Sequence, residues 1–234
     1  MKTALYKLGY EIEGEFSQPL IKELKKWGEI KSDGSLSRCS SSKHLLSRVE
    51  SLAEYASPPL HHKDDMAEIR SFFTLLDKAY QNKEFHFNNT CGFHIHLSFT
   101  PSKPPELFST QFMEYFRELL KEKQKLVVKR RAANRFCRIV IDESELIQEE
   151  TRYRFVNILP AYNKHGTIEF RIFPANKPQI MYRYLIFTLG AVRQFLRRQH
   201  HLAFEAEIDD TTEPLTENYS STSSLQVLSN NFSN

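Results

Sequence analysis

Three short segments of the sequence carry ionisable side chains at alternate positions. They hold Glu11, Glu13 and Glu15, then His94 and His96, and finally Glu169 and Arg171. Carboxylates and imidazoles are ligands for divalent cations, and a guanidinium binds phosphate or carboxylate oxygens. In a β-strand, alternate side chains leave the same face about 7 Å apart. Each segment therefore has the residue types and spacing of a cation or phosphate site, provided that it forms a strand.

The histidine segment predicts a strand through its strict alternation. Apolar residues take the odd positions from Phe93 to Phe99, while His94, His96 and Ser98 lie between them. Period two over this length indicates a strand with one buried face. Two neutral imidazoles on the other face are placed to bind a metal or a phosphate. A surface strand with two solvated histidines is the alternative that this motif alone leaves open.

The glutamate segment, residues 8–16, also alternates, with Tyr10 and Ile12 opposite the glutamates. Three carboxylates on one face repel one another, so at least one would hold its proton longer unless a cation relieved the repulsion. The alternative is an exposed acidic edge strand. Gly9 and Gly14 weaken an ordinary strand, and they predict close approach by another backbone or a ligand.

Residues 153–173 predict two further strands joined by a turn at residues 163–166. In the first, Arg154 and Asn157 take opposite faces. In the second, Glu169 and Arg171 alternate with isoleucine and phenylalanine. A surface ion pair between Glu169 and Arg171, worth at most about 1 kcal/mol, is the alternative reading of that spacing.

A single sheet containing all these segments would pack its apolar face on helices and carry a floor of carboxylates and imidazoles on the other. Such a floor binds hard divalent cations, and Mg²⁺ usually brings substrate phosphates with it. Arg171 would then neutralise charge on a transferring phosphoryl group. The sequence has no GxxxxGKS/T loop, so a nucleotide would not be held by a P-loop.

The elements that position these strands follow from the rest of the pattern. Helices are expected over residues 19–27, ended by Gly28, over residues 64–83 with Asp64 as N-cap, over residues 110–135 and over residues 179–196. Glu54 is expected on a strand that ends before Ser57-Pro58-Pro59, because the residue before a proline favours extended backbone. Glu50 is expected either near the strand that carries Glu54 or at the end of a helix that begins at Lys43. Turn chemistry is the alternative role for Asp33 and Ser35, next to Gly34.

Bulk properties predict one compact domain over residues 1–208 and a disordered polar tail over residues 209–234. The formal net charge of +3 gives no argument for nucleic acid, and no apolar run reaches the ~18 residues that span a bilayer. The amino-terminal residues do not form a signal peptide, and the three widely spaced cysteines are expected to be reduced. We therefore expect a cytoplasmic protein that acts without a membrane.

Six motifs, read in order, resemble the putative amidoligase family, a group of the glutamine synthetase-like carboxylate–amine ligases. They are GYEIEGEF, SDGS, AEYASPPL, CGFHIHLSF, RYRFVNI and GTIEFRIF, and the resemblance extends from about Leu8 to about Leu196. It implies an α+β fold in which a curved, mainly antiparallel sheet carries helices on its outer face, as in the catalytic domains of glutamine synthetase and guanidino kinases. It implies ATP and two or more Mg²⁺ (or Mn²⁺) on the inner face. The implied reaction activates a carboxylate as an acyl phosphate, which an amine attacks to give an amide and ADP.

The resemblance also implies roles for individual residues. The metal ligands would be Glu11, Glu13, Glu54, His94 and Glu169. His96 and Arg171 would lie at the nucleotide phosphates, and one or more of Arg131, Arg135 and Arg154 would add positive charge there. Asp33, Ser35 and Asn157 fall in family-like motifs and are assigned to substrate. Glu15 and Asp33 are the candidates for the general base that deprotonates the amine. The chain is far shorter than glutamine synthetase, and no separate N-terminal domain can be located in it.

Two other functions remain open at this level. One is phosphotransfer to a small acceptor, since guanidino kinases share a related sheet. The other is a non-catalytic binding module, in which the basic helix at residues 121–138 contacts nucleic acid or an acidic partner. That basic stretch is otherwise a solvated helix face. For the ligase we expect small-molecule or peptide carboxylate and amine substrates and no nucleic acid, with the oligomeric state open to a homo-oligomer.

Overall fold

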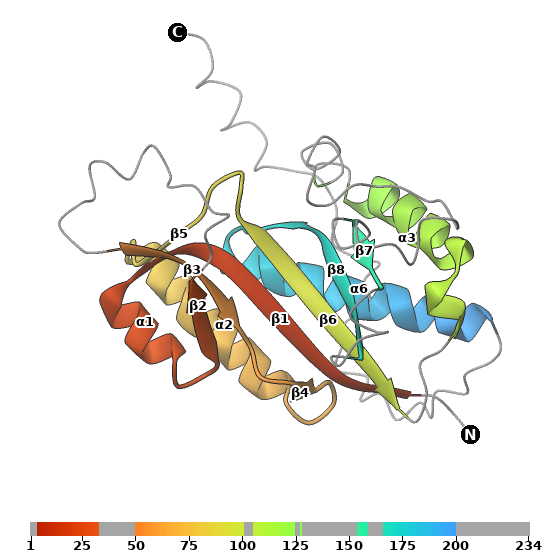
Figure 1. Ribbon diagram of the computed structural model, residues 1–234, viewed down its shortest axis with the longest axis horizontal. Coiled ribbons are helices and arrows are strands. Elements are labelled where there is room, and N and C mark those ends of the chain that lie inside the picture. The colour runs from red at the N-terminus through yellow and green to blue at the C-terminus, as the bar shows by residue number, and fades with distance from the viewer. Residues whose placement is uncertain are drawn as a thin grey trace, which may run out of the picture. The chain divides into compact units, whose positions relative to one another are not determined.

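The fold is an open antiparallel sheet with helices packed on one of its faces. The computed structural model describes residues 4–32, 50–100, 105–124, 127, 154–158 and 166–199. The strands are β1 (Ala4–Ser17), β2 (Glu29–Ser32), β3 (Glu50–Ala56), β4 (Leu60–His61), β5 (Phe85–His86), β6 (Gly92–Thr100), β7 (Val156–Asn157) and β8 (Thr167–Pro174). Their order is β2-β3-β1-β6-β8-β7, and β4 and β5 each pair with β1 (Figure 1). Every described pairing is antiparallel, as the sequence predicted.

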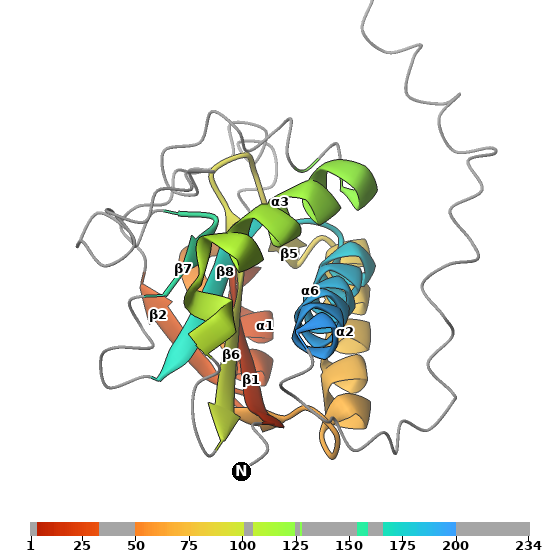
Figure 2. The ribbon, with the colours of Figure 1, turned by 90° about the vertical axis from the view of Figure 1, so that its right-hand side faces the viewer.

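Helices cover the apolar face of this sheet. They are α1 (Gln18–Leu24), α2 (Met66–Gln81), the short 3-10 helix η2 (Pro105–Phe108), α3 (Thr110–Lys123) and α6 (Pro178–Arg198). Figure 2 shows α2 and α6 side by side against the same face. Tyr10 of β1 meets Phe72 and Phe73 of α2 with ring centroids 5.4 and 5.3 Å apart, and Phe173 of β8 stacks on Tyr184 of α6 at 4.7 Å. The alternation predicted in the sequence thus places its aromatic face against the helices.

The helix α3 packs on the apolar face of the sheet at β8 and contacts α6. Phe112 and Phe116 of α3 contact Phe170 of β8 with ring centroids 6.2 and 5.0 Å apart, and Phe112 also packs edge-on against Phe195 of α6 at 5.1 Å. Ser109 begins α3 because its hydroxyl oxygen accepts the backbone N–H of Phe112 at 3.2 Å. The helix predicted at residues 179–196 is confirmed. The helix predicted at residues 110–135 begins as expected but ends at Lys123, with Gln124 in a non-helical conformation.

Three further predicted boundaries are wrong. The first helix ends at Leu24 and not at Trp27, because the chain turns after Lys25 and the Gly28 N–H donates to the Leu24 carbonyl oxygen at 3.0 Å. Asp64 is not the N-cap of α2, because the chain is still turning after β4 and the helix begins at Met66 with Asp65 at the cap position. The Asp65 carboxylate accepts the backbone N–H of His61 at 2.7 Å instead of capping the helix. Glu50 does not end a helix from Lys43, since it is the first residue of β3 and pairs with Ser17.

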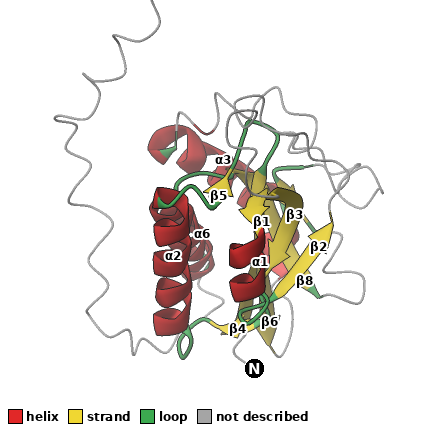
Figure 3. Cartoon of the chain, turned by 90° about the vertical axis from the view of Figure 1, so that its left-hand side faces the viewer, coloured by secondary structure: helices red, strands yellow, loops and turns green. Residues whose placement is uncertain are grey.

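The strand β2 was missed by the sequence analysis. Its four residues, Glu-Ile-Lys-Ser, are mostly exposed and show no apolar alternation, so they carry no local strand signal. They form a strand because β3 offers a free edge, and Lys31 pairs with Glu54 there. Figure 3 shows β2 beyond β3 at the margin of the sheet.

A β-bulge lies where β8 pairs with β6. Phe93 pairs with Phe173 and Ile95 with Phe170, so β8 has one residue more than β6 over this step. The extra residue breaks the alternation, and consecutive Ile172 and Phe173 are both fully buried. Glu169 comes before the bulge, and it remains on the face opposite the helices.

Some predictions fall outside the described residues. These are the serine-rich loop at residues 35–47, the basic residues 129–138 and the polar tail at residues 209–234. Within the part of the chain that the structure describes, no helix combines the length and apolar character needed to cross a membrane.

The two glycines singled out in β1 differ in their surroundings. A Cβ at Gly14 would lie 2.6 Å from Phe85 Cε2 and 2.8 Å from the carbonyl oxygen of His86, whereas a Cβ at Gly9 would meet nothing closer than 3.6 Å. Close approach by another backbone is therefore confirmed at Gly14, where β5 pairs with β1, whereas no described backbone comes as close to Gly9.

We expect Gly14→Ala to lower the free energy of unfolding by about 1–3 kcal/mol, because β5 must shift to admit the methyl group. Gly9→Ala is the matched control in the same strand, and it should leave stability unchanged or raise it by up to about 1 kcal/mol. Urea unfolding followed by circular dichroism measures both. Equal stability of the two variants would contradict the close approach.

Candidate functional site

The pairing register places the ionisable side chains of several strands next to one another. Because Tyr10 of β1 packs on α2, the alternating positions 11, 13 and 15 face the opposite side of the sheet. The cross-strand partners on that side are Glu11 with His94, Glu13 with Glu54, His96 with Glu169, and Asn157 with Glu169. We call the group formed by Glu11, Glu13, Glu54, His94, His96, Glu169 and Arg171 the sheet cluster.

His94 lies at the centre of the sheet cluster. Its Nδ1 is 3.3 Å from Glu11 Oε2 and 3.5 Å from Glu169 Oε1, and its Nε2 is 3.7 Å from Glu13 Oε1. The His94 side chain is 5% exposed, and that of His96 is 21% exposed. The alternative of a surface strand with two solvated histidines is therefore wrong.

His96 has a ring nitrogen without a suitable hydrogen-bond partner. Its Nδ1 is 3.4 Å from the hydroxyl of Thr167. Its Nε2 lies 3.3 Å from Glu11 Oε2 and 4.0 Å from Glu169 Oε1, yet among the described residues no group is aligned to bond it. A buried nitrogen of this kind calls for a partner, and a cation is the usual partner of an imidazole beside carboxylates.

Glu169 is held from both sides. The Arg171 guanidinium contacts its Oε1, and the Asn157 amide donates to its Oε2 at 2.7 Å. Since the side chain of Glu169 is 5% exposed and that of Arg171 is 20% exposed, the alternative of a surface ion pair between them is wrong. The pair of Glu169 and Arg171 belongs to the interior of the sheet cluster.

Glu13 and Glu15 are also buried. One carboxylate oxygen of Glu13 accepts the backbone N–H of Gly92, which is where β6 begins. Glu15 lies opposite Leu52 of β3 and His86 of β5. The alternative of an exposed acidic edge strand is wrong, because β1 lies between β3 and β6.

Mutual interactions set the ionisation of the inner groups. Burial alone would raise the pKa of Glu11, but the hydrogen bond with His94 and the charges of His94 and His96 lower that pKa well below its usual range. Burial alone would lower the pKa of His96, but Glu11 and Glu169 outweigh it and raise that pKa. The pKa of Glu169 is lowered despite complete burial, chiefly because of the charge on Arg171.

Glu54 differs from Glu11 and Glu169 because its pKa is raised and not lowered. Burial, and then the negative charge of Glu11, raise the pKa of Glu54 to about 7. Lys31 Nζ is 4.0 Å from Glu54 Oε1 and is itself 45% exposed, so it offsets little of this cost. The three glutamates of residues 11–15 were expected to include the carboxyl that holds its proton longer; here the neighbouring Glu54 has that property.

The donor set of the sheet cluster fits a hard divalent cation. Two groups of three residues bring candidate ligand atoms within 4.8 Å of one another, namely Glu11, His96 and Glu169, and Glu11, Glu54 and His94. Glu11 belongs to both groups, whereas Glu13 belongs to neither and has one oxygen on Gly92. Carboxylate oxygens with one or two imidazoles suit Mg²⁺ or Mn²⁺.

The remaining site residues named from the sequence have different outcomes. Arg154 is buried, at 6% exposure, and pairs through its backbone at the start of the β7 segment. Asp33, Ser35, Arg131 and Arg135 lie outside the described residues. Sequence reasoning missed Lys31, because β2 has no strand pattern, and Thr167, because a threonine at a strand start is common.

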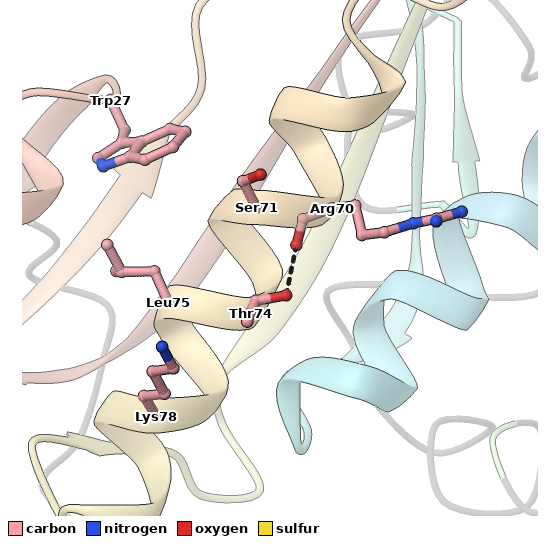
Figure 4. Close-up of a pocket in the computed structure, with 6 residues that line it drawn as sticks. All are labelled: Trp27, Arg70, Ser71, Thr74, Leu75 and Lys78. Carbon is pink, nitrogen blue, oxygen red and sulfur yellow. Dashed lines mark hydrogen bonds between the residues drawn. The ribbon is translucent and has the colours of Figure 1, made fainter.

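A hollow lies on the helix side of the sheet, and the residues that line it are not those of the sheet cluster. It has a volume of about 360 Å³ and is lined by Trp27, Arg70, Ser71, Thr74, Leu75 and Lys78. In Figure 4 the Trp27 indole faces α2, and the Arg70 side chain turns away from it towards α6. The Ser71 and Thr74 hydroxyls each donate to a carbonyl oxygen one turn earlier in α2, at 2.9 Å. No residue of the sheet cluster lines this hollow.

Comparison with known proteins identifies a family for the chain. A family model described as "Putative amidoligase enzyme" matches residues 9–146, which is more than half of the chain. The matched stretch contains β3, β6 and the part of β1 from residue 9 onward, and Glu169 and Arg171 lie beyond it. No curated protein matches the chain.

The raised pKa of Glu54 predicts how stability depends on pH in the metal-free protein. A carboxyl with a folded pKa of about 7 favours folding below its unfolded pKa of about 4.5, and this contribution is lost as the pH rises through 7. Glu54→Gln should therefore match wild type near pH 4.5 and exceed it by about 1 kcal/mol at pH 8, after allowance for solvent screening.

Urea unfolding at pH 4.5 and pH 8 in the presence of a chelator measures this difference. Glu29→Gln is the matched control, because Glu29 lies 3.8 Å from the same Lys31 but is 71% exposed. A stability difference between Glu54→Gln and wild type that does not change with pH would contradict the buried, protonated carboxyl.

Proposed function

The chain belongs to the putative amidoligase family, and on that premise we propose that it is an ATP- and Mg²⁺-dependent carbon–nitrogen ligase that joins a carboxylate to an amine. The observation that carries this proposal is the meeting of carboxylates from β1, β3 and β8 with two imidazoles of β6 on one buried face. Small molecules or peptides would supply the carboxylate and the amine, and residues 1–208 would form the catalytic domain.

The proposed reaction has two steps. The substrate carboxylate oxygen attacks the γ-phosphorus of ATP, so that the bond to the bridging oxygen breaks and an acyl phosphate and ADP form. The amine nitrogen then attacks the acyl carbon, phosphate leaves, and the nitrogen loses a proton. The products are an amide, ADP and inorganic phosphate.

The sheet cluster would serve the first step. Glu11, Glu54 and His94 would hold one cation, and Glu11, His96 and Glu169 a second, which would give His96 Nε2 the partner that it lacks. Bound Mg²⁺ or Mn²⁺ supplies positive charge against the phosphate oxygens of ATP. His96 is 21% exposed, so it can also face those oxygens from the floor of the site.

Positive and basic side chains complete the proposed machinery. Arg171 is 20% exposed beyond its contact with Glu169, which leaves part of its guanidinium to offset charge on the transferring phosphoryl group. Arg154, Arg131 and Arg135 are proposed to add to this charge. Glu15, which is buried beside the cluster, and Asp33 are the candidates for the base that takes the proton of the amine.

The architecture is compatible with this chemistry. An open antiparallel sheet with helices on one face leaves its other face for substrates, as the resemblance to glutamine synthetase and guanidino kinase catalytic domains implies. We propose that fold relationship for this chain. Asp33, Ser35 and Asn157 were assigned to substrate from the sequence, and of these Asn157 contacts Glu169.

Metal binding tests the proposed cation site directly. We expect Mn²⁺, followed by electron paramagnetic resonance, to bind the wild-type protein and to raise its melting temperature. Glu11→Gln should weaken Mn²⁺ binding most, by at least about tenfold, because Glu11 belongs to both ligand groups. Glu114→Gln, an exposed acidic change on α3, is the control and should bind as wild type does. Equal binding by both variants would refute the assigned site.

Turnover tests the reaction class. With ATP, Mg²⁺ and mixtures of candidate carboxylates and amines, we expect ADP release by wild type and a loss of at least about a hundredfold in Glu13→Ala and His94→Ala. Mass spectrometry of the products should show an amide. A stable phosphorylated acceptor would favour phosphotransfer, and salt-dependent nucleic-acid binding without ADP release would favour the binding module. Unchanged turnover in both variants would remove the sheet cluster from the reaction.

A further inference from the structure

Asn157 lies at a position where a polar side chain has a specific partner. It is in β7, a strand of two residues that pairs only with β8 among the described residues, and its register partner is Glu169. The Asn157 side chain is 3% exposed, so its amide has left water and must be satisfied within the protein. Its Nδ2 is 2.7 Å from Glu169 Oε2.

The direction of this hydrogen bond follows from chemistry. An ionised carboxylate accepts hydrogen bonds and donates none, so the amide nitrogen of Asn157 must face it. Arg171 contacts the other oxygen, Oε1. The two donors come from different strands and bind different oxygens, and together they fix the rotation of the carboxylate about its last bond.

The fixed carboxylate points one oxygen into the sheet cluster. Glu169 Oε1 lies 3.5 Å from His94 Nδ1 and 4.0 Å from His96 Nε2, whereas Oε2 is taken by Asn157. Without Asn157 only the Arg171 contact at Oε1 would remain, so the carboxylate could turn about that contact and Oε1 would be held less firmly beside His96. Groups that orient a ligand in this way typically change metal affinity by about 10–100-fold when removed.

We infer that Asn157 is a positioning residue, which holds Glu169 so that its Oε1 completes a cation site with Glu11 and His96. This inference rests on the proposed cation site, and it replaces the assignment of Asn157 to substrate. This role also explains the two-residue strand β7 at the edge of the sheet, because β7 places the Asn157 amide opposite the Glu169 carboxylate.

Mn²⁺ affinity measured by electron paramagnetic resonance and by calorimetry tests the inference. We expect Asn157→Ala to weaken binding by about 10–100-fold. Asn157→Ser, which keeps a polar group but is too short to reach Glu169, should give a similar loss with less disturbance of the fold. Asn176→Ala, in the loop after β8, is the matched control and should stay within about twofold of wild type, since Asn176 bonds Tyr184 and the backbone of Lys177.

A double-mutant cycle separates positioning from a general effect on folding. If Asn157 acts through Glu169, then Asn157→Ala should cause no further loss of Mn²⁺ affinity in a Glu169→Gln protein. The same loss in both backgrounds would overturn the inference, and so would wild-type affinity in both Asn157 variants. Absence of Mn²⁺ binding by the wild-type protein would overturn the proposed cation site, and this inference with it.

Discussion

Carboxylates buried on one face of a sheet must be neutralised where they lie, because an unpaired charge away from water is too costly to keep. Glu13, Glu15 and Glu169 are all under 10% exposed, and Glu11 and Glu54 lie beside them. The protein meets this demand through the Arg171 guanidinium, imidazoles between carboxylates, donors on Gly92 and Asn157, and a raised pKa of Glu54. Candidate ligand atoms of Glu11, Glu54 and His94, and of Glu11, His96 and Glu169, lie within 4.8 Å of one another on this face. The proposed cation site rests on that proximity.

Packing on the apolar side of the sheet holds these charged side chains in place. Tyr10, Phe93 and Ile95 pack against helices on one side of β1 and β6, while their neighbours in sequence carry the ionisable groups on the other. Slipping either strand by one residue would exchange the two faces, so the hydrophobic core fixes the register of the cluster. The bulge in β8 shows the limit of this rule. After Glu169 the strand stops alternating, and both Ile172 and Phe173 enter the core.

The sequence predicted most of the site because the site is built on period-two alternation, which local pattern reveals. Glu11, His94 and Glu169 were placed on one face from their neighbours alone, and the coordinates bring them together. The sequence could not show which strands pair, since pairing depends on packing between distant segments. For that reason Lys31 was missed and Glu50 was left between two elements. Nor could it show that Asn157 reaches Glu169, because alternation gives the face of a side chain and not its partner. Asp33 and the arginines at 131 and 135 remain expectations from sequence.

The order of the strands has a consequence for folding during synthesis. Glu11 and His94 are 83 residues apart in the chain, and His96 and Thr167 are 71 residues apart. Synthesis delivers β1 and β6 before β8, so a nascent chain would pair β6 with β1 on one side and leave its other edge open. A product that ended with the family-matched stretch would hold β1, β3 and β6 but would still present that edge. Such a fragment would tend to aggregate through the open edge of β6. In the complete chain β8 pairs with that edge and covers it.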